Sequence, residues 1–154
     1  NAEAVQTALE ATYHVNVTLL GETWEGLTPA QQLRLYHEHQ YHVTVHGAHE
    51  ANVIVARPGT RVVELQCLHP ADPHPRIDAT QNDDNDVDWY GPPSWFSMFS
   101  RRMGMEHTVY GESTGCTSAN GQAGVHRSTH VRITNVTALV TLIARRFELL
   151  AKEV

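Results

Sequence analysis

The sequence is poor in cysteine and in charged residues, and it has no long apolar run. Its two cysteines, Cys67 and Cys116, stand outside any Cys-x-x-Cys pair, which argues against a cysteine-based zinc site. They could form one disulfide or remain reduced. No apolar run approaches the ~20 residues of a membrane-spanning helix. Charged residues make up 18% of the chain and apolar residues 41%, a profile that indicates a globular protein.

Positive charge is also scarce, with 11 Lys and Arg against 17 Asp and Glu and a formal net charge of −6. A nucleic acid is therefore not an expected partner, because its phosphates attract basic surfaces. The 154 residues are enough for one domain with a sizeable core, residues 1–154. Asn1 is not an initiator methionine, and we expect the chain to be a fragment of a longer protein whose compartment signals lie elsewhere.

The most informative stretch runs from residue 41 to residue 65. Open α/β sheets bind ligands beyond the carboxyl ends of their strands, and a helix that starts there offers free N–H groups to a phosphate. The pattern places a glycine at such a point; a tight turn without a ligand is the alternative. The predicted elements are a strand over Tyr41–Val45, a turn at His46-Gly47-Ala48, a helix over Ala48–Ala56, a break at Arg57–Thr60 and a strand over Arg61–Leu65.

The rest of the chain alternates predicted helices and strands, which favours parallel strands with right-handed crossovers. Thr28 and Pro29 have the sequence of a helix N-cap and first turn. The long stretch Gln66–Pro93 is predicted to be irregular and Gly111–Thr129 to be a flexible connection. The other predicted elements are helices over Ala2–Ala11, Thr28 to His37–His39, Ser94–Met103 and Val136–Lys152, and strands over Tyr13–Leu20, His107–Tyr110 and His130–Ile133.

The segment HGAHEANVIVARPGTRVVEL resembles the signature of family 61 glycosyltransferases, which is His-Gly-Ala-Gly-Leu-(Thr/Ala)-Asn, an apolar run, Pro-Gly and a Glu after two or three apolar residues. Leu27–Gln32 also resembles a helix start that precedes this signature in the family. The sequence departs from the pattern at His49-Glu50, where the family usually has Gly-Leu. The matching residues are His46, Gly47, Ala48, Asn52, Pro58, Gly59 and Glu64.

This resemblance implies a Rossmann-like parallel sheet flanked by helices, one lobe of a two-lobe (GT-B type) enzyme. The implied activity is an inverting transfer of a xylose, arabinose or N-acetylglucosamine class sugar from a UDP-sugar donor to a glycan or glycoprotein hydroxyl. The general base would lie on the remaining amino-terminal lobe, outside this chain. No cofactor is required, although a divalent cation, Mn or Mg, is possible. In a eukaryote the location would be the lumen of the Golgi or endoplasmic reticulum.

The residues predicted to bind the donor follow from this resemblance and from the edge of the sheet. A protonated His46 can pair with a diphosphate, and the Glu64 carboxylate can accept both ribose hydroxyls. A turn-orienting histidine and a solvated strand-end charge are the alternatives, and Asn52 could instead tie the loop together. The full predicted donor site is His46, Gly47, Ala48, His49, Asn52 and Glu64.

Several other groups have both a functional and a plainer interpretation. Trp89 and Trp95 could stack on a uracil or a sugar and Arg101 could neutralise a diphosphate, or they could be a core plug and an exposed helix end. The pairs Asp84/Asp86 and Asp86/Asp88 are best explained as a solvated loop.

The 11 histidines raise a third possibility, a small histidine–metal protein. The metalloprotease pattern His-Glu-x-x-His fails at Tyr41. His42, His46 and His49 could converge on zinc, but scattered histidines are commoner, so no residue is assigned as a metal ligand. A non-catalytic nucleotide-sugar-binding or structural domain of the same fold remains the main alternative to the enzyme.

Overall fold

The centre of the protein is a three-stranded parallel sheet with strand order β1-β2-β3. The computed structural model describes residues 1–67, 99–100, 102–112, 116–117 and 130–149. Val43, Val63 and Thr108 lie side by side across the sheet. The predicted parallel α/β architecture is therefore confirmed. Strand β1 spans Tyr41–Val45, β2 spans Arg61–Cys67 and β3 spans Glu106–Glu112.

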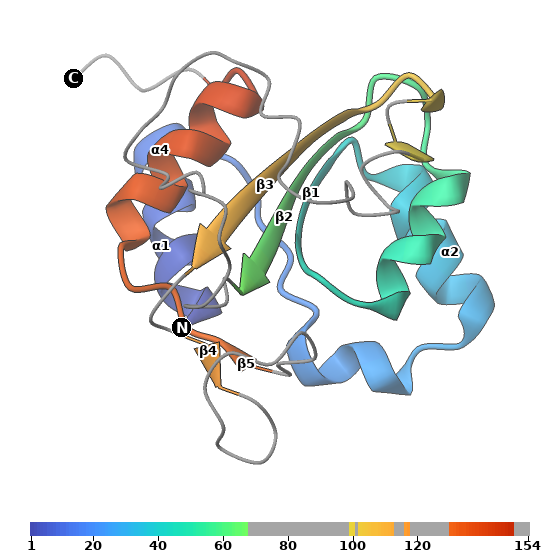
Figure 1. Ribbon diagram of the computed structural model, residues 1–154, viewed down its shortest axis with the longest axis horizontal. Coiled ribbons are helices and arrows are strands. Elements are labelled where there is room, and N and C mark those ends of the chain that lie inside the picture. The colour runs from blue at the N-terminus through green and yellow to red at the C-terminus, as the bar shows by residue number, and fades with distance from the viewer. Residues whose placement is uncertain (68–98, 101, 113–115, 118–129, 150–154) are drawn as a thin grey trace, which may run out of the picture.

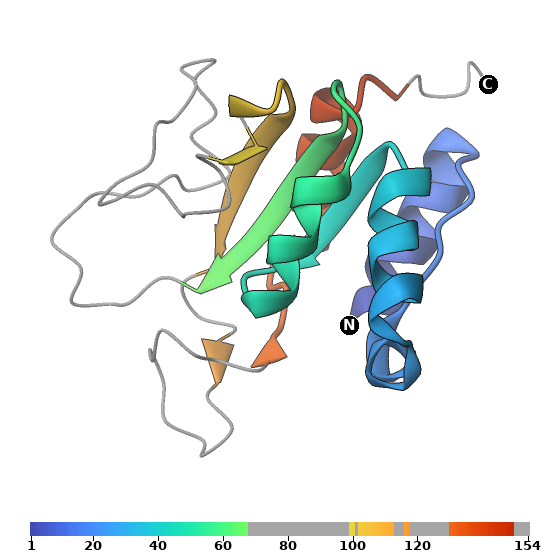
Figure 2. The same ribbon diagram turned by 90° about the vertical axis from the view of Figure 1, so that its right-hand side faces the viewer.

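Helices cover both faces of this sheet, so that the described part of the chain forms three layers (Figures 1 and 2). Helices α1 (Ala2–Tyr13) and α4 (Val136–Arg146) lie on one face. Helix α2 (Pro29–Glu38) and the 3₁₀ helix η2 (Ala48–Val55) lie on the other face. A second 3₁₀ helix, η1 (Gly21–Gly26), connects α1 to α2.

The two faces of β2 serve different cores because successive strand residues point to opposite sides. Val63 and Leu65 belong to the larger core, which α1 and α4 close. Val62 belongs to the smaller core beside Tyr36 of α2 and Val53 of η2. Glu64 follows Val62 by two residues, so it shares the face that α2 and η2 cover. This alternation places a carboxylate inside the layer where the chain turns after β1.

Helix α2 confirms the predicted cap in atomic detail. The Thr28 hydroxyl accepts the Gln31 N–H, and the Gln31 side chain accepts the Thr28 N–H. This reciprocal capping box satisfies two backbone donors that a helix start leaves open, and Pro29 follows in the first turn. The cap fixes where α2 begins, and α2 leads directly into β1.

The predicted strand over Tyr13–Leu20 is wrong. Helix α1 continues to Tyr13 and ends at His14, which takes the left-handed conformation with φ of 54°. The backbone beyond it finds side-chain partners: Val17 donates its N–H to Glu10 and accepts the Gln6 amide. Because these groups are satisfied by α1, the segment packs its valines on the core without joining the sheet.

Helix α4 begins as predicted, with the Asn135 side chain accepting the Ala138 N–H, but the prediction that it reaches Lys152 is wrong. The helix ends at Arg146. Glu148 takes a left-handed φ of 53°, and the Leu149 N–H donates to the Ala144 carbonyl. This is the Schellman arrangement that closes a helix, here without the usual glycine.

The remaining predictions fare unequally. The helix predicted over Ala48–Ala56 is present as η2, and the strand predicted over His107–Tyr110 is β3. The strand predicted over His130–Ile133 is shorter: β5 (His130–Val131) pairs antiparallel with β4 (Cys116–Thr117), which lies in the predicted flexible connection. No helix in the described ranges is long and apolar enough to cross a membrane. Most of the predicted irregular stretch Gln66–Pro93 and most of the predicted helix Ser94–Met103 lie outside the described residues. The side chains of Cys67 and Cys116 are not described, so their pairing is not tested.

Candidate functional site

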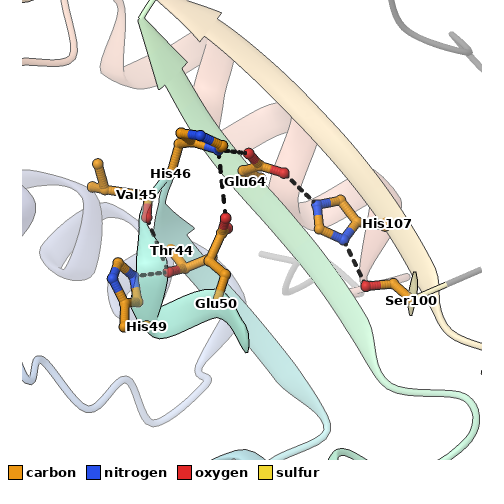
Figure 3. A network of polar contacts seen from close by, with 8 residues as sticks. All are labelled: Thr44, Val45, His46, His49, Glu50, Glu64, Ser100 and His107. Atoms are coloured by element: carbon orange, nitrogen blue, oxygen red, sulfur yellow. Dashed lines mark hydrogen bonds and ion pairs between the residues drawn. The ribbon is translucent and has the colours of Figure 1, made fainter. Parts of the chain in front are cut away.

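Three side chains from consecutive elements meet where β1 ends (Figure 3). His46 is the first residue after β1, and its N–H donates to the Leu65 carbonyl at 2.8 Å, which extends the ladder by one bond. Glu50 stands in η2, and Glu64 lies in β2 opposite Thr44. His46 Nδ1 is 2.5 Å from Glu64 Oε1 and 3.6 Å from Glu50 Oε2. The chain turn after β1 thus brings one imidazole between two carboxylates.

Glu64 is the centre of a longer polar chain that crosses the sheet (Figure 3). Its second oxygen, Oε2, accepts a hydrogen bond from His107 Nε2 of β3 at 2.7 Å, and His107 Nδ1 lies 2.9 Å from the Ser100 hydroxyl. Burial alone would raise the pKa of Glu64, but hydrogen bonds from His107 and His46 outweigh it and lower the pKa to about 2. Glu64 is therefore an ionised carboxylate with an exposed fraction of 0%.

Glu50 is a buried carboxyl of the opposite kind. It is 2% exposed, and neither of its oxygens has a hydrogen-bond partner among the residues that the structure describes. Burial and then the charge of Glu64 raise its pKa to about 9, and the Gly47 backbone amide opposes the shift only in part. Two carboxylates this close cannot both ionise cheaply, so Glu64 carries the charge and Glu50 holds a proton.

Ser100, His107 and Glu64 are connected in the manner of a serine–histidine–carboxylate triad. Catalysis by such a triad requires that the hydroxyl reach a substrate. Ser100 has an exposed fraction of 0% and the His107 side chain of 1%. The arrangement therefore orients Glu64 and does not present a nucleophile.

The cluster of His46, Glu50 and Glu64 could hold a metal ion. One ligand atom from each residue lies within 4.8 Å of the others. His46 is the accessible member, since its side chain is 34% exposed while both carboxylates are buried. The sequence assigned no residue as a metal ligand, so this candidate metal site is found only in the structure.

Of the predicted donor-site residues, the structure brings His46 and Glu64 into direct contact. Gly47 and Ala48 form the start of η2, where Gly47 is its N-cap with an extended φ of 173°. A Cβ on Gly47 would lie 3.0 Å from the His49 ring. His49 itself turns away from the cluster and lies 2.8 Å from the Thr44 hydroxyl through Nε2. The glycine is therefore needed for the close approach of His49.

Two other predicted residues are placed differently from the cluster. Asn52 is half-buried in the middle of η2. His42 stacks on Tyr36 with a centroid separation of 4.7 Å and bonds the His39 carbonyl. His42, His46 and His49 thus do not converge on one point, contrary to the zinc alternative. The predicted residues Trp89, Trp95 and Arg101, and the pairs Asp84/Asp86 and Asp86/Asp88, lie outside the described residues.

Sequence reasoning missed Glu50, His107 and Ser100. Glu50 follows His46 by four residues, a spacing that places two side chains on one side of a helical turn. His107 lies three residues after Gly104, and the parallel register sets it opposite Val62, two residues before Val109, the partner of Glu64. These spacings were visible in the sequence, but the convergence depends on which strands are neighbours.

Comparisons with protein-family models, with curated proteins and with solved structures found no match. The interpretation of the site therefore depends on its own geometry.

Proposed function

We propose that this chain is the donor-binding lobe of an inverting glycosyltransferase that takes a UDP-linked sugar. The observation that carries the proposal is the unit β1–His46–Gly47–η2–β2 at the carboxyl edge of a parallel sheet. This is where open α/β sheets bind nucleotides. The fit of this unit to the family 61 signature adds the sugar-transfer chemistry.

In this proposal His46 is the residue that meets the donor diphosphate. Its side chain is 34% exposed, and the ionised Glu64 behind it fixes the ring through Nδ1. When protonated, an imidazole held in this way can pair with a departing diphosphate without any change in its own orientation. Such preorganised charge is usually the largest electrostatic contribution to catalysis. The contact between Glu64 and a ribose stays a prediction. It requires the carboxylate to exchange at least one of its histidine partners for a hydroxyl.

The proposed reaction is direct displacement at the anomeric carbon by a hydroxyl of a glycan or glycoprotein acceptor. The general base belongs to an amino-terminal lobe, so the isolated chain binds donor without efficient turnover. Nucleotide binding does not require a metal in this scheme, and Mn or Mg would act by neutralising the diphosphate. The GT-B arrangement and the secretory-lumen location belong to the same proposal.

Calorimetric titration of the purified chain with UDP, UDP-xylose and UDP-N-acetylglucosamine, with and without Mn²⁺, tests the proposal. We expect UDP to bind with a Kd between micromolar and sub-millimolar, and we expect His46→Gln and Gly47→Val to weaken it. Gly26→Ala is the matched control, because a Cβ there meets nothing within 4 Å. Absence of binding to all three nucleotides, or equal binding by His46→Gln, would contradict the proposal.

The second candidate is a non-catalytic nucleotide-sugar-binding or structural domain of the same fold. A specific observation favours it: the space beside Gly47 is filled by the His49 ring at 3.0 Å, where the family signature has a second glycine. His49→Gly separates a nucleotide-binding domain, catalytic or not, from a purely structural one. If the donor-binding surface is merely blocked by this side chain, the substitution should tighten UDP binding, whereas a structural domain should show no binding in either form.

A further inference from the structure

We propose that His46, Glu50 and Glu64 form a binding site for a divalent transition-metal ion, Zn²⁺ or Mn²⁺. The cluster supplies three ligand atoms from a turn, a helix and a strand, all within 4.8 Å of one another. Ligands around one ion at 2.0–2.2 Å lie roughly 3–3.5 Å apart, so small side-chain shifts suffice. A bound ion would displace the proton that Glu50 holds without metal, and the two carboxylates would then together neutralise the charge of a divalent ion.

Glu50 provides an independent reason to expect an ion. The Glu50 side chain points at His46 (Figure 3), and the residue is only 2% exposed. Neither of its carboxyl oxygens has a hydrogen-bond partner in the described structure. Buried carboxyl groups are ordinarily hydrogen-bonded, because an unsatisfied one costs free energy. A metal ion between Glu50 and His46 would satisfy the group that the protein alone leaves unsatisfied.

The residues behind the cluster have the arrangement of an outer shell. Metal-binding carboxylates are usually held by a second hydrogen bond that fixes their orientation. Glu64 receives that bond from His107 at 2.7 Å, and His107 is held in turn by Ser100 at 2.9 Å. The Oε2 atom of Glu64 is therefore bonded to His107, and its Oε1 atom is directed toward His46 and Glu50.

The ligand set favours a transition metal over Mg²⁺ or Ca²⁺. Imidazole nitrogen suits Zn²⁺ and its neighbours, whereas Mg²⁺ prefers an all-oxygen octahedron with several waters. Three protein ligands leave at least one coordination position open, as in catalytic zinc sites. The 34% exposure of the His46 side chain gives the ion a route in and gives that open position access to solvent.

Titration of the chelator-treated full chain with ZnCl₂, MnCl₂ and MgCl₂ tests this proposal with the metal alone. We expect one equivalent of Zn²⁺ to bind tightly, Mn²⁺ to bind less tightly and Mg²⁺ to be at least about tenfold weaker than Mn²⁺. The thermal unfolding midpoint should rise with Zn²⁺ concentration, because the ion binds the folded state. Neither readout involves a nucleotide, so failure here leaves the donor-lobe proposal standing, and the reverse also holds.

Glu50→Gln is the decisive variant, because the glutamine amide cannot lose a proton to become a charged ligand, and no hydrogen bond to the Glu50 oxygens is lost in the described structure. We expect its Zn²⁺ affinity to fall at least about tenfold while its circular dichroism stays unchanged, and His107→Gln to lose about 10- to 100-fold. His14→Asn and Glu106→Gln remove an exposed histidine and an exposed carboxylate and should bind as the original chain does. No tight equivalent, or equal affinity in Glu50→Gln, would overturn the proposal and assign any binding to the other histidines.

Discussion

Strand β2 carries two charged clusters three residues apart, and they differ in almost every physical respect. Arg61, at its start, pairs with Glu106 at 3.2 Å and with Glu148 at 2.9 Å. These two acids are 64% and 76% exposed, whereas Glu64 and His107 are 0% and 1% exposed. Ion pairs in water contribute about 0–1 kcal/mol, but a buried charge must be fully partnered to be tolerated. The ion pairs of Arg61 are therefore ordinary surface electrostatics. The buried cluster around Glu64 constrains which side chains the fold can accept there, and this indicates a site.

The largest expected effect comes from removing the centre of the buried cluster. Glu64→Ala leaves two histidines without their shared acceptor, and we expect it to lower the free energy of unfolding by about 3–5 kcal/mol. Urea unfolding at pH 7 in a chelating buffer measures the loss. If Glu64→Ala does not fold, Glu64→Gln should give a smaller but measurable loss. A loss below about 1 kcal/mol, the range of an exposed pair, would abolish the distinction between the two clusters.

The next effect concerns the far end of the same chain of hydrogen bonds. Ser100→Ala removes the hydroxyl beside His107 Nδ1 in a fully buried place, and we expect a loss of about 1–3 kcal/mol. Thr60→Val is the matched control: Thr60 is 1% exposed, and its hydroxyl has no hydrogen-bond partner in the described structure. The control should be close to neutral in the same urea assay. Equal losses in both variants would mean that packing, not hydrogen bonding, explains the effect.

Glu50 gives the buried region a pH dependence that the exposed pairs lack. Its pKa is about 9 in the folded protein, against an ordinary value of 4.5, so the folded state holds an extra proton between these values. The stability from this proton is full below pH 4.5 and is lost as pH rises through 9, with a slope of up to about 1.4 kcal/mol per pH unit. The difference in unfolding free energy between the original chain and Glu50→Gln, measured without metal from pH 5 to pH 9, isolates this group. A flat difference would contradict the assignment.

The smallest expected effect lies at the start of β2. Glu106→Gln removes one of the two partners of Arg61, and we expect a change of at most about 1 kcal/mol. Repeating the measurement in about 0.5 M NaCl should abolish this difference, because salt screens exposed charges. The loss in Glu64→Ala should persist in salt. A salt-sensitive Glu64 effect would show that the buried cluster is accessible to ions.

The sequence predicts those parts of the fold that depend on local chemistry. The capping box at Thr28 and the turn at Gly47 are each written in a few neighbouring residues, and each is present. Strand β1 is also present, but the expectation that its alternating apolar residues are buried is wrong, because Tyr41 and Val43 are 44% and 40% exposed. The strand expected over 13–20 failed because its backbone partners, Gln6 and Glu10, are side chains of the preceding helix. Strand propensity does not indicate that side chains of a neighbouring helix will bond the backbone of the segment.

The candidate site divides in the same way. His46 and Glu64 were chosen from one motif, and their contact follows from the parallel pairing of β1 with β2. His107 lies 43 residues beyond Glu64, so its role depends on β3 being the other neighbour of β2. In the sequence, Glu50 is only a departure from the family 61 signature. Its burial depends on the packing of η2 against the sheet, which the sequence does not show.

The contact between the first and last described helices has a consequence for how the chain is made. The Asn1 amide bonds Ile133 in both directions across 132 positions, and Val5 and Leu9 share a core with Leu139 and Ile143. At about 5–20 residues per second, a ribosome completes α4 on the order of ten seconds after α1 has been made. During that interval the apolar stripe of α1 lacks the α4 side of its core and is open to chaperones. A chain that stops short of α4 would therefore leave Val5 and Leu9 without the part of their core that Leu139 and Ile143 supply.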